Sequence, residues 1–310
     1  MNRESTKAFL LLISMITSPS VFAAQEFPLY PGAIPNSIDA PDEEALRDPK
    51  EVYPFLNNIS RPTVTVYLPE KSDAKSSAVI ILPGGGYRGV SIVKEGHAVA
   101  KQFNEWGVAA FVVKYRTPSP THMRDRTLGP LQDAQQAIHL VRERAREWSI
   151  DPSRVGVMGF SAGGHLASTL GTHFNEPVLP AWKGANLRPD FLMLIYPVIT
   201  MSPPFAHEGS RKMLLGDAPA ADLVRKFSNE LAVTAATPPT FLVHAATDPT
   251  VPVENSLRFF EALHAQKVAT QLMVYPAGGH GFGLNNPTTT DRWMDRCREW
   301  MRSQNLLDRE

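Results

Sequence analysis

The hydrophobic residues of this chain form short unbroken runs that alternate with stretches of helical periodicity. Unbroken apolar runs are typical of strands buried on both faces, whereas apolar residues at every third or fourth position indicate amphipathic helices. The runs predict strands at 78–82, 108–113, 155–158, 191–196, 241–244 and 272–275. The periodic stretches predict helices at about 93–106, 130–148, 162–173, 253–266 and 291–303. This alternation indicates an α/β fold with a mostly parallel, doubly wound sheet and helices on both of its faces.

Two segments depart from this rhythm. Residues 24–61 are rich in Pro, Asp and Glu without a sustained period, so we expect an extended arm lying on a single domain formed by residues 62–310. A half-buried strand at 61–69, with alternating apolar residues, opens that domain. Residues 200–237 interrupt the alternation with a proline pair, a Gly-Ser pair and one short helical piece at about 220–230. They form either a surface excursion or a lid over the strand ends.

The first 23 residues have the pattern of a signal peptide. Arg3 and Lys7 precede an apolar run at 8–16, and Val-Phe-Ala at 21–23 offers a small-residue cleavage site before Ala24. The run is too short to span a bilayer, so we expect no stable membrane insertion. The sequence therefore predicts an exported protein, either periplasmic or secreted.

Composition excludes several classes of partner and site. Positive and negative residues balance at 31 each and form no basic stripe, which argues against nucleic-acid binding. Cys297 is the only cysteine, so no intrachain disulfide forms, and its helical spacing from Trp293 and Trp300 indicates core packing. The scattered histidines and the absence of an H-E-x-x-H motif predict no metal site, and we expect no cofactor.

The strongest chemical signal is the G-x-S-x-G motif at 159–163. It follows the strand at 155–158 directly and continues as a helix, which is the setting of a nucleophilic serine on a sharp strand-to-helix turn. Gly159 and Gly163 suit that turn because residues two positions from the serine crowd its backbone unless they lack side chains. The motif predicts Ser161 as a nucleophile, and the alternative is a tight glycine turn with a capping serine.

A serine nucleophile needs a base and an orienting carboxylate, which follow it in the order Ser, Asp or Glu, His in α/β-hydrolases. His280 lies in a glycine-rich loop directly after the last predicted strand and is the candidate base. Asp248 lies just beyond the strand at 241–244 and is the candidate acid. The alternatives are a solvated loop histidine and a turn or capping aspartate.

The reaction also needs donors for a developing oxyanion. Gly84–Gly86 follows the strand at 78–82, and the backbone N–H groups of Gly85, Gly86 and Ala162 are the expected donors. A phosphate-binding loop is the alternative for these glycines, but no Walker A lysine follows them.

Taken together, these loops resemble those of exported α/β-hydrolase esterases of the acetylxylan and feruloyl esterase type. The resemblance covers nearly all of the chain from about Thr63 onward. Matching segments are 83–87, 95–96, 114–116, 151–152, 159–167, 207–210, 238–241, 251–252 and 279–283, together with Asp248. The resemblance implies Ser161 as nucleophile, His280 as base and Asp248 as its partner. It also implies deacetylation of plant-polysaccharide fragments or simpler acetylated sugars. Pro83 replaces the histidine of the lipase-type H-G-G-G, which weakens a lipid-esterase interpretation.

The expected function is therefore a serine esterase that hydrolyses short acyl esters on a small-molecule or oligosaccharide substrate. Tyr87, Arg88 and His207 are the candidate substrate contacts. A prolyl-oligopeptidase-like peptidase and a non-catalytic glycan-binding protein on the same fold remain alternatives. The sequence does not name the sugar or the acyl group, because specificity depends on pocket contacts, and it leaves the oligomeric state open.

Overall fold

The computed structural model describes residues 24–47, 55–70 and 76–307. The expected signal peptide at 1–23 lies outside the described residues. Within them the chain forms an eight-stranded sheet with the order β1-β4-β7-β5-β8-β9-β10-β11. Its strands are β1 Gln25–Pro28, β4 Thr63–Tyr67, β5 Ser76–Leu82, β7 Ala109–Lys114, β8 Ile150–Phe160, β9 Leu192–Ile195, β10 Thr240–Ala245 and β11 Thr270–Tyr275. The strands from β7 to β11 are parallel, and β4 runs antiparallel to both of its neighbours.

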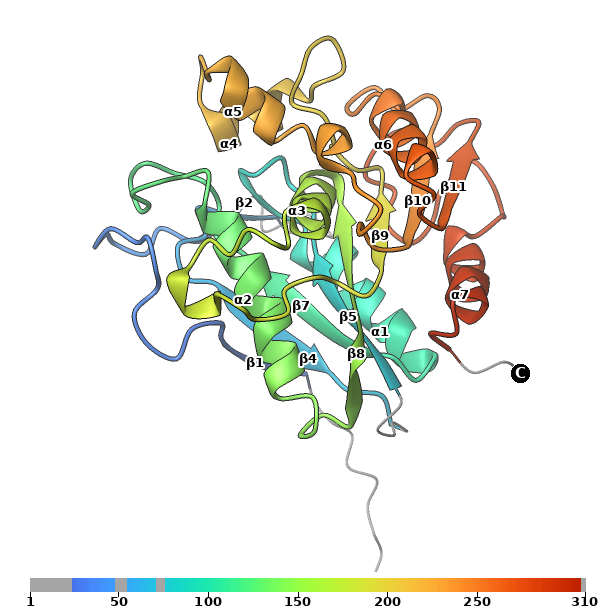
Figure 1. Ribbon diagram of the computed structural model, residues 1–310, viewed down its shortest axis with the longest axis horizontal. Coiled ribbons are helices and arrows are strands. Elements are labelled where there is room, and N and C mark those ends of the chain that lie inside the picture. The colour runs from blue at the N-terminus through green and yellow to red at the C-terminus, as the bar shows by residue number, and fades with distance from the viewer. Residues whose placement is uncertain (1–23, 48–54, 71–75, 308–310) are drawn as a thin grey trace, which may run out of the picture.

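Helices connect the parallel strands, as the periodicity predicts. The connecting and flanking helices are η1 Ile92–His97 with α1 Ala98–Glu105, α2 Gly129–Glu143, α3 Ser161–Thr172, α6 Glu254–Ala265 and α7 Trp293–Ser303. The chain steps from β5 to β7 in one direction across the sheet and from β7 to β8 in the other. Because such crossovers are right-handed, the two directions place helices on opposite faces. In Figure 1, α2 and α3 cross in front of the sheet and α1 lies behind it. The predicted α/β class and doubly wound arrangement are confirmed.

Most predicted elements agree with the structure to within two residues, but the boundary between α2 and β8 differs. The helix ends five residues early, at Glu143, and β8 starts five residues early, at Ile150. Residues 144–149 form consecutive turns between them, and Trp148 within these turns is buried in the core. Its apolar side chain continues the helical spacing of the sequence, which is why the sequence predicts a helix that extends to 148, although the backbone is no longer helical there. Burial of an apolar side chain thus does not require the helix to continue.

The N-terminal segment contributes two strands to a small sheet as well as β1 to the large one. β1 pairs with β4 through the register Gln25 to Val66. β2 Ala45–Arg47 and β3 Phe55–Asn57 form a three-stranded sheet with β6 Gly89–Val90. Because β6 lies just after the loop that follows β5, this small sheet brings N-terminal residues close to the strand ends where the candidate site lies.

The segment at 200–237 holds more helix than the sequence predicts. It contains α4 Glu208–Leu215, α5 Ala221–Lys226 and a 3-10 turn, η3 Asn229–Ala232. The expected helical piece corresponds to α5 and η3, whereas α4, which includes Gly209-Ser210, was not predicted. The imidazole of His207 accepts the Ser210 N–H and caps α4, a task for which Ser, Thr, Asp and Asn are the common residues.

The pairing register places the carboxyl ends of the parallel strands at one level. Leu82 pairs with Gly159, Phe160 with Ile195, and Ala245 with Tyr275. The loops after these strands therefore meet at one edge of the sheet, which is where open α/β sheets bind ligands.

Candidate active site

Ser161 lies on a strained turn between β8 and α3. Its φ is 51°, in the left-handed region, which costs a residue with a Cβ about 1–3 kcal/mol. A Cβ on Gly159 would lie 2.2 Å from the Gly163 carbonyl oxygen, and a Cβ on Gly163 would lie 2.1 Å from that of Leu82. Both glycines are thus required by close backbone approach, for the steric reason that the motif suggested.

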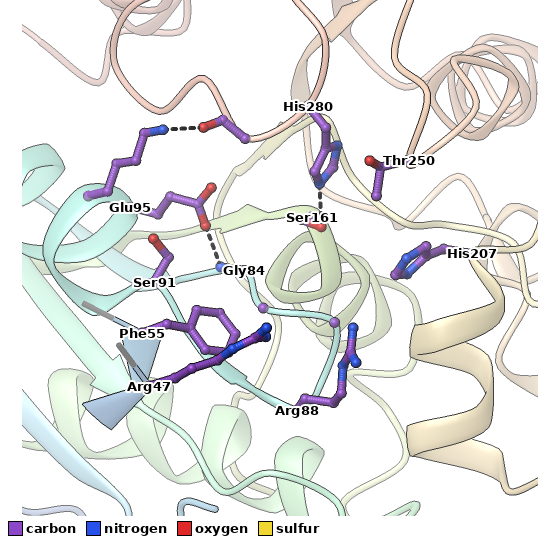
Figure 2. A pocket seen from close by; sticks show the side chains of 14 residues that line it. Arg47, Phe55, Gly84, Arg88, Ser91, Glu95, Ser161, His207, Thr250 and His280 are labelled. Atoms are coloured by element: carbon purple, nitrogen blue, oxygen red, sulfur yellow. Dashed lines mark hydrogen bonds between the residues drawn. The ribbon is translucent and has the colours of Figure 1, made fainter. Parts of the chain in front are cut away.

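The structure brings Ser161, His280 and Asp248 together in one chain of hydrogen bonds. His280 Nε2 lies 2.8 Å from Ser161 Oγ, and His280 Nδ1 lies 2.6 Å from Asp248 Oδ2. A carboxylate only accepts, so Nδ1 carries the proton and Nε2 accepts the hydroxyl of Ser161. In this geometry the imidazole is positioned to take the serine proton. Figure 2 shows His280 directed at Ser161 across the top of the cavity.

Asp248 is held as a carboxylate in a buried position. The N–H groups of Thr250 and Val251 donate to its Oδ1 at 2.8 and 2.9 Å. Burial by itself raises the pKa of Asp248, but the hydrogen bonds from His244 and His280 outweigh burial and hold the pKa well below its usual value. Asp248 therefore stays charged and can stabilise a positive charge on His280.

His244 is a second histidine beside Asp248, and its position at the end of a predicted strand gave it no role in the sequence. Its Nε2 lies 2.9 Å from the Val251 carbonyl oxygen and 3.4 Å from Asp248 Oδ2, while Ser256 Oγ lies 2.8 Å from its Nδ1. Because a carbonyl only accepts, Nε2 carries the proton, and Nδ1 accepts from Ser256. Through its hydrogen bond to the Val251 carbonyl, His244 stabilises the loop that carries Asp248. Its spacing of four residues from Asp248 is the only sequence signal that could have pointed to it.

The loop after β5 presents the predicted oxyanion donors next to Ser161. Within the described part of the chain, the N–H groups of Gly85 and Gly86 have no hydrogen-bond acceptor in the protein, and neither does that of Ala162 at the start of α3. A Cβ on Gly85 would lie 2.1 Å from the Gly89 carbonyl oxygen, so this tight loop requires glycine there. These backbone groups remain available to a bound oxyanion.

Glu95 fixes the same loop from behind, a role that the sequence did not indicate. Its side chain is buried; Oε2 accepts the Gly84 N–H at 2.8 Å and Oε1 accepts the Tyr196 hydroxyl at 2.7 Å. The Tyr196 hydroxyl in turn accepts the Gly283 N–H at 3.0 Å. Burial raises the pKa of Glu95, against the lowering effect of these hydrogen bonds. The only available signal was that Glu95-Gly96 is one of the segments shared with the esterases.

A cavity of about 580 Å³ opens beside Ser161 and His280. Arg88 and His207, two of the three candidate substrate contacts, line it and point into it in Figure 2. The third, Tyr87, does not line the cavity: it is buried, and its hydroxyl lies 2.8 Å from His165 Nδ1. The expected substrate contact by Tyr87 is corrected to a packing role, because the turn at Gly86 directs its side chain into the core. Arg47 and Phe55 of the small sheet line the cavity as well.

The described residues also bear on metal binding, membrane-spanning helices and thiol reactivity. Among the described residues, no three His, Cys, Asp or Glu side chains are grouped so that they could hold a metal ion. None of the described helices is both long enough and apolar enough to cross a membrane. Cys297 is buried in α7, where burial raises the pKa of its thiol well above the usual value.

Comparison with known families places this site in context. The model of the BD-FAE family matches residues 64–263. The chain belongs to the BD-FAE family. A second model, that of the dienelactone hydrolase family, matches residues 224–310 of this BD-FAE protein.

Two relatives and one solved structure are similar to this BD-FAE protein. An acetylxylan esterase from Xylanibacter ruminicola is 36% identical over 233 residues, which cover 74% of this chain and 45% of that protein. The endo-1,4-beta-xylanase B of Butyrivibrio fibrisolvens is 34% identical over 238 residues, which cover 75% and 36%. This chain therefore spans less than half the length of either relative. The crystal structure of an acetyl ester-xyloside bifunctional hydrolase from Caldicellulosiruptor lactoaceticus has a TM-score of 0.75 at 37% identity, covering 92% of this chain and 97% of that one. The predicted fold and the resemblance to α/β-hydrolase esterases are confirmed.

Proposed function

We propose that this protein is a serine esterase that removes short acyl groups, acetyl in particular, from carbohydrates such as xylan fragments. The observation that carries this proposal is the hydrogen-bond chain from Ser161 through His280 to the buried carboxylate of Asp248. The names of the similar proteins, acetylxylan esterase and acetyl ester-xyloside hydrolase, support the substrate class.

The reaction proceeds by acyl transfer in two halves. Ser161 Oγ attacks the ester carbonyl carbon while its proton passes to His280 Nε2, and the charge of Asp248 stabilises the resulting imidazolium. The tetrahedral intermediate collapses, the ester C–O bond breaks, and His280 gives the proton to the departing sugar oxygen, which leaves as a hydroxyl. Water then attacks the acyl-serine carbonyl while His280 takes a proton from it. The bond between the acyl carbon and Ser161 Oγ breaks, His280 returns the proton to Ser161 Oγ, and the carboxylic acid is released.

The oxyanion of each tetrahedral intermediate is stabilised by the N–H groups of Gly85, Gly86 and Ala162. Backbone donors that are already in place lose no orientational freedom during the reaction, and removal of a single donor of this kind costs about 100- to 1,000-fold in turnover in other serine hydrolases. The α3 N-terminus adds a favourable partial positive charge at the same point.

The proposal is tested with the variant Ser161→Ala. We expect release of acetate from acetylated xylo-oligosaccharides, and hydrolysis of 4-nitrophenyl acetate, to fall by at least about 1,000-fold with an unchanged thermal unfolding temperature. Ser153→Ala, an exposed serine at the other end of β8, is the matched control and should retain full activity. Turnover by Ser161→Ala within a few-fold of the unmodified protein would refute the assignment.

A panel of substrates separates the alternatives. Acetylated xylo-oligosaccharides, feruloyl esters, short aryl esters and a proline-containing peptide are offered to the same preparation. Cleavage of the peptide without ester hydrolysis would establish a peptidase. Binding of xylo-oligosaccharides without turnover, and without labelling of Ser161 by an organophosphonate, would establish a glycan-binding protein.

We also propose that residues 1–23 are removed on export and that the mature protein is periplasmic or secreted. The charged start, the apolar run and the small-residue site before Ala24 support this proposal. N-terminal sequencing of the exported protein should begin at Ala24. A protein retained in the cytoplasm with Met1 in place would contradict it.

A further inference from the structure

The cavity beside Ser161 is lined by more cationic side chains than carboxylates. The cations Arg47, Arg88 and Lys94 line it, whereas Glu95 is the one carboxylate among its described lining residues. Both oxygens of Glu95 already accept hydrogen bonds from the protein. Because the chain as a whole has a net charge of zero, this is a local concentration of positive charge around the catalytic serine.

Arg88 is the cation best placed to meet a substrate. It lies two residues after the oxyanion loop, Gly84–Gly86, which carries the proposed oxyanion donors Gly85 and Gly86. Its own N–H donates to the Gly85 carbonyl at 3.1 Å, which fixes its backbone relative to Gly85 and Gly86. Its side chain is exposed to the cavity. Across the described ranges, no carboxylate pairs with its guanidinium and no other side chain or carbonyl accepts from it. The guanidinium thus offers its five N–H donors to the cavity, two to three residues along the chain from Gly85 and Gly86.

His207 presents a second donor to the cavity, from the start of α4. Its Nδ1 accepts the Ser210 N–H and lies 2.8 Å from Ser210 Oγ, so Nε2 carries the proton of the neutral imidazole. Burial lowers the pKa of His207, and the nearby His280 and Arg88 lower it further, against the raising effect of the Asp248 and Glu208 carboxylates. The imidazole therefore stays neutral, and the Nε2–H of this cavity-lining residue is not used by the cap.

We propose that the cavity selects esters that carry a carboxylate, which Arg88 binds through its guanidinium and His207 through Nε2–H. A guanidinium matches a carboxylate with two parallel N–H···O bonds, and a concave site with more cationic side chains than carboxylates raises the local concentration of an anion. This inference rests on the proposed esterase function. The carboxylate has two possible sources, a uronic acid unit of the saccharide or the free end of a dicarboxylic acyl group, and the experiment distinguishes them.

The experiment compares matched charged and neutral substrates. Acetylated xylo-oligosaccharides with and without a uronic acid branch test the first source, and 4-nitrophenyl hemisuccinate against 4-nitrophenyl butyrate tests the second. We expect Arg88→Gln to lower kcat/KM for the charged member of one pair at least about tenfold more than for its neutral member. The preference of the unmodified protein should weaken as salt rises, because an exposed guanidinium is screened.

Arg124→Gln is the matched control, because Arg124 is exposed and does not line the cavity. It should leave both pairs unchanged. An equal effect of Arg88→Gln on charged and neutral substrates, or a preference of the unmodified protein for both neutral members, would overturn the proposal.

A binding measurement separates this inference from the proposed function. Ser161→Ala, with and without Arg88→Gln, is titrated calorimetrically with the uronic acid xylo-oligosaccharide and with succinate monoester. Binding that weakens about tenfold on loss of Arg88, in a protein whose unmodified form hydrolyses no ester, would support the anion site and refute the esterase. If the unmodified protein hydrolyses esters but carboxylate binding does not depend on Arg88, the esterase function would be supported and the anion site refuted.

Discussion

His165 is the buried histidine of α3, four residues after Ser161. Its Nε2 lies 2.8 Å from the Phe227 carbonyl oxygen, and its Nδ1 lies 2.8 Å from the Tyr87 hydroxyl. The carbonyl accepts the Nε2 proton, so the Tyr87 hydroxyl donates to Nδ1 and no site is left for a second proton. Burial lowers the pKa of His165 from 6.5 to about 4. His165 thus has a structural role: it connects Tyr87, which follows the oxyanion loop, to Phe227 in the segment at 200–237.

The lowered pKa of His165 leads us to expect a loss of stability in mild acid. Because folding lowers the pKa of His165, this imidazole is protonated below pH 6.5 in the unfolded chain but only below about pH 4 in the folded chain. The contribution of neutral His165 is complete above pH 6.5 and is lost as the pH falls toward 4. We expect the free energy of unfolding in urea to fall by on the order of 2 kcal/mol between about pH 7 and pH 4.5 from this group.

The variant His165→Gln isolates that contribution, since it keeps a donor and an acceptor without a titratable group. It should be less stable than the unmodified protein at pH 7 and should lose less stability on acidification. The same pH dependence in both proteins would show that other groups are responsible.

At the scale of elements, Glu95 connects three loops that meet at the carboxyl edge of the sheet. From η1 it contacts Gly84 after β5 and Tyr196 after β9, and Tyr196 holds Gly283 after β11. The Tyr196 ring also packs edge-on against His280, with centroids 4.9 Å apart. The loop with the proposed oxyanion donors and the loop of His280, the proposed base, are thus fixed relative to each other through one carboxylate.

We predict that Glu95→Gln lowers kcat about tenfold to a hundredfold and changes KM by less than about threefold. The glutamine amide cannot accept from both Gly84 and Tyr196, so the oxyanion donors shift relative to Ser161, which affects the transition state more than the bound ester. Steady-state kinetics on 4-nitrophenyl acetate measure both constants, and the unfolding temperature checks the fold. Glu105→Gln, an exposed residue of α1, is the control. A rise in KM with unchanged kcat would show that Glu95 affects ester binding instead.

At the scale of the whole molecule, a buried ion pair attaches the N-terminal segment to the domain. Arg116 contacts both oxygens of Asp133 at 2.8 to 3.1 Å, and both side chains are fully buried. The Tyr30 hydroxyl donates to Asp133 at 2.9 Å, and Arg116 donates to the Pro35 carbonyl at 2.7 Å. The segment before β4 is therefore integral to the core, beyond its pairing through β1 (Figure 1).

Loss of one partner of this pair should be more harmful than loss of both. Arg116→Met leaves the carboxylate of Asp133 buried without its cation, and we expect it to lower the free energy of unfolding by about 3–5 kcal/mol. The double variant Arg116→Met with Asp133→Leu should regain a large part of that loss, because an apolar pair needs no compensation. Urea denaturation of the three proteins measures the difference. A double variant no more stable than the single one would show that the pair's other hydrogen bonds dominate.

The sequence by itself determined the order and type of the parallel strands and of the helices that connect them, and the edge at which the chemistry lies. Apolar runs and helical spacing are local patterns, and parallel strands bring the loops at their carboxyl ends to one edge of the sheet. Ser161, Asp248 and His280 could therefore be selected by their places after β8, β10 and β11. The glycines of 159–163 are required by the same local sterics.

Only the tertiary structure decided which side chains meet across that edge. Glu95 and Tyr196 lie 101 positions apart, and Tyr30 and Asp133 lie 103 apart, so no periodicity relates them. Tyr87 was expected to contact the substrate, but the direction of a single side chain depends on the backbone of the folded loop, where Tyr87 has a φ of 61°. Element identity is set by local backbone preference and burial, whereas these contacts are set by how the finished layers pack.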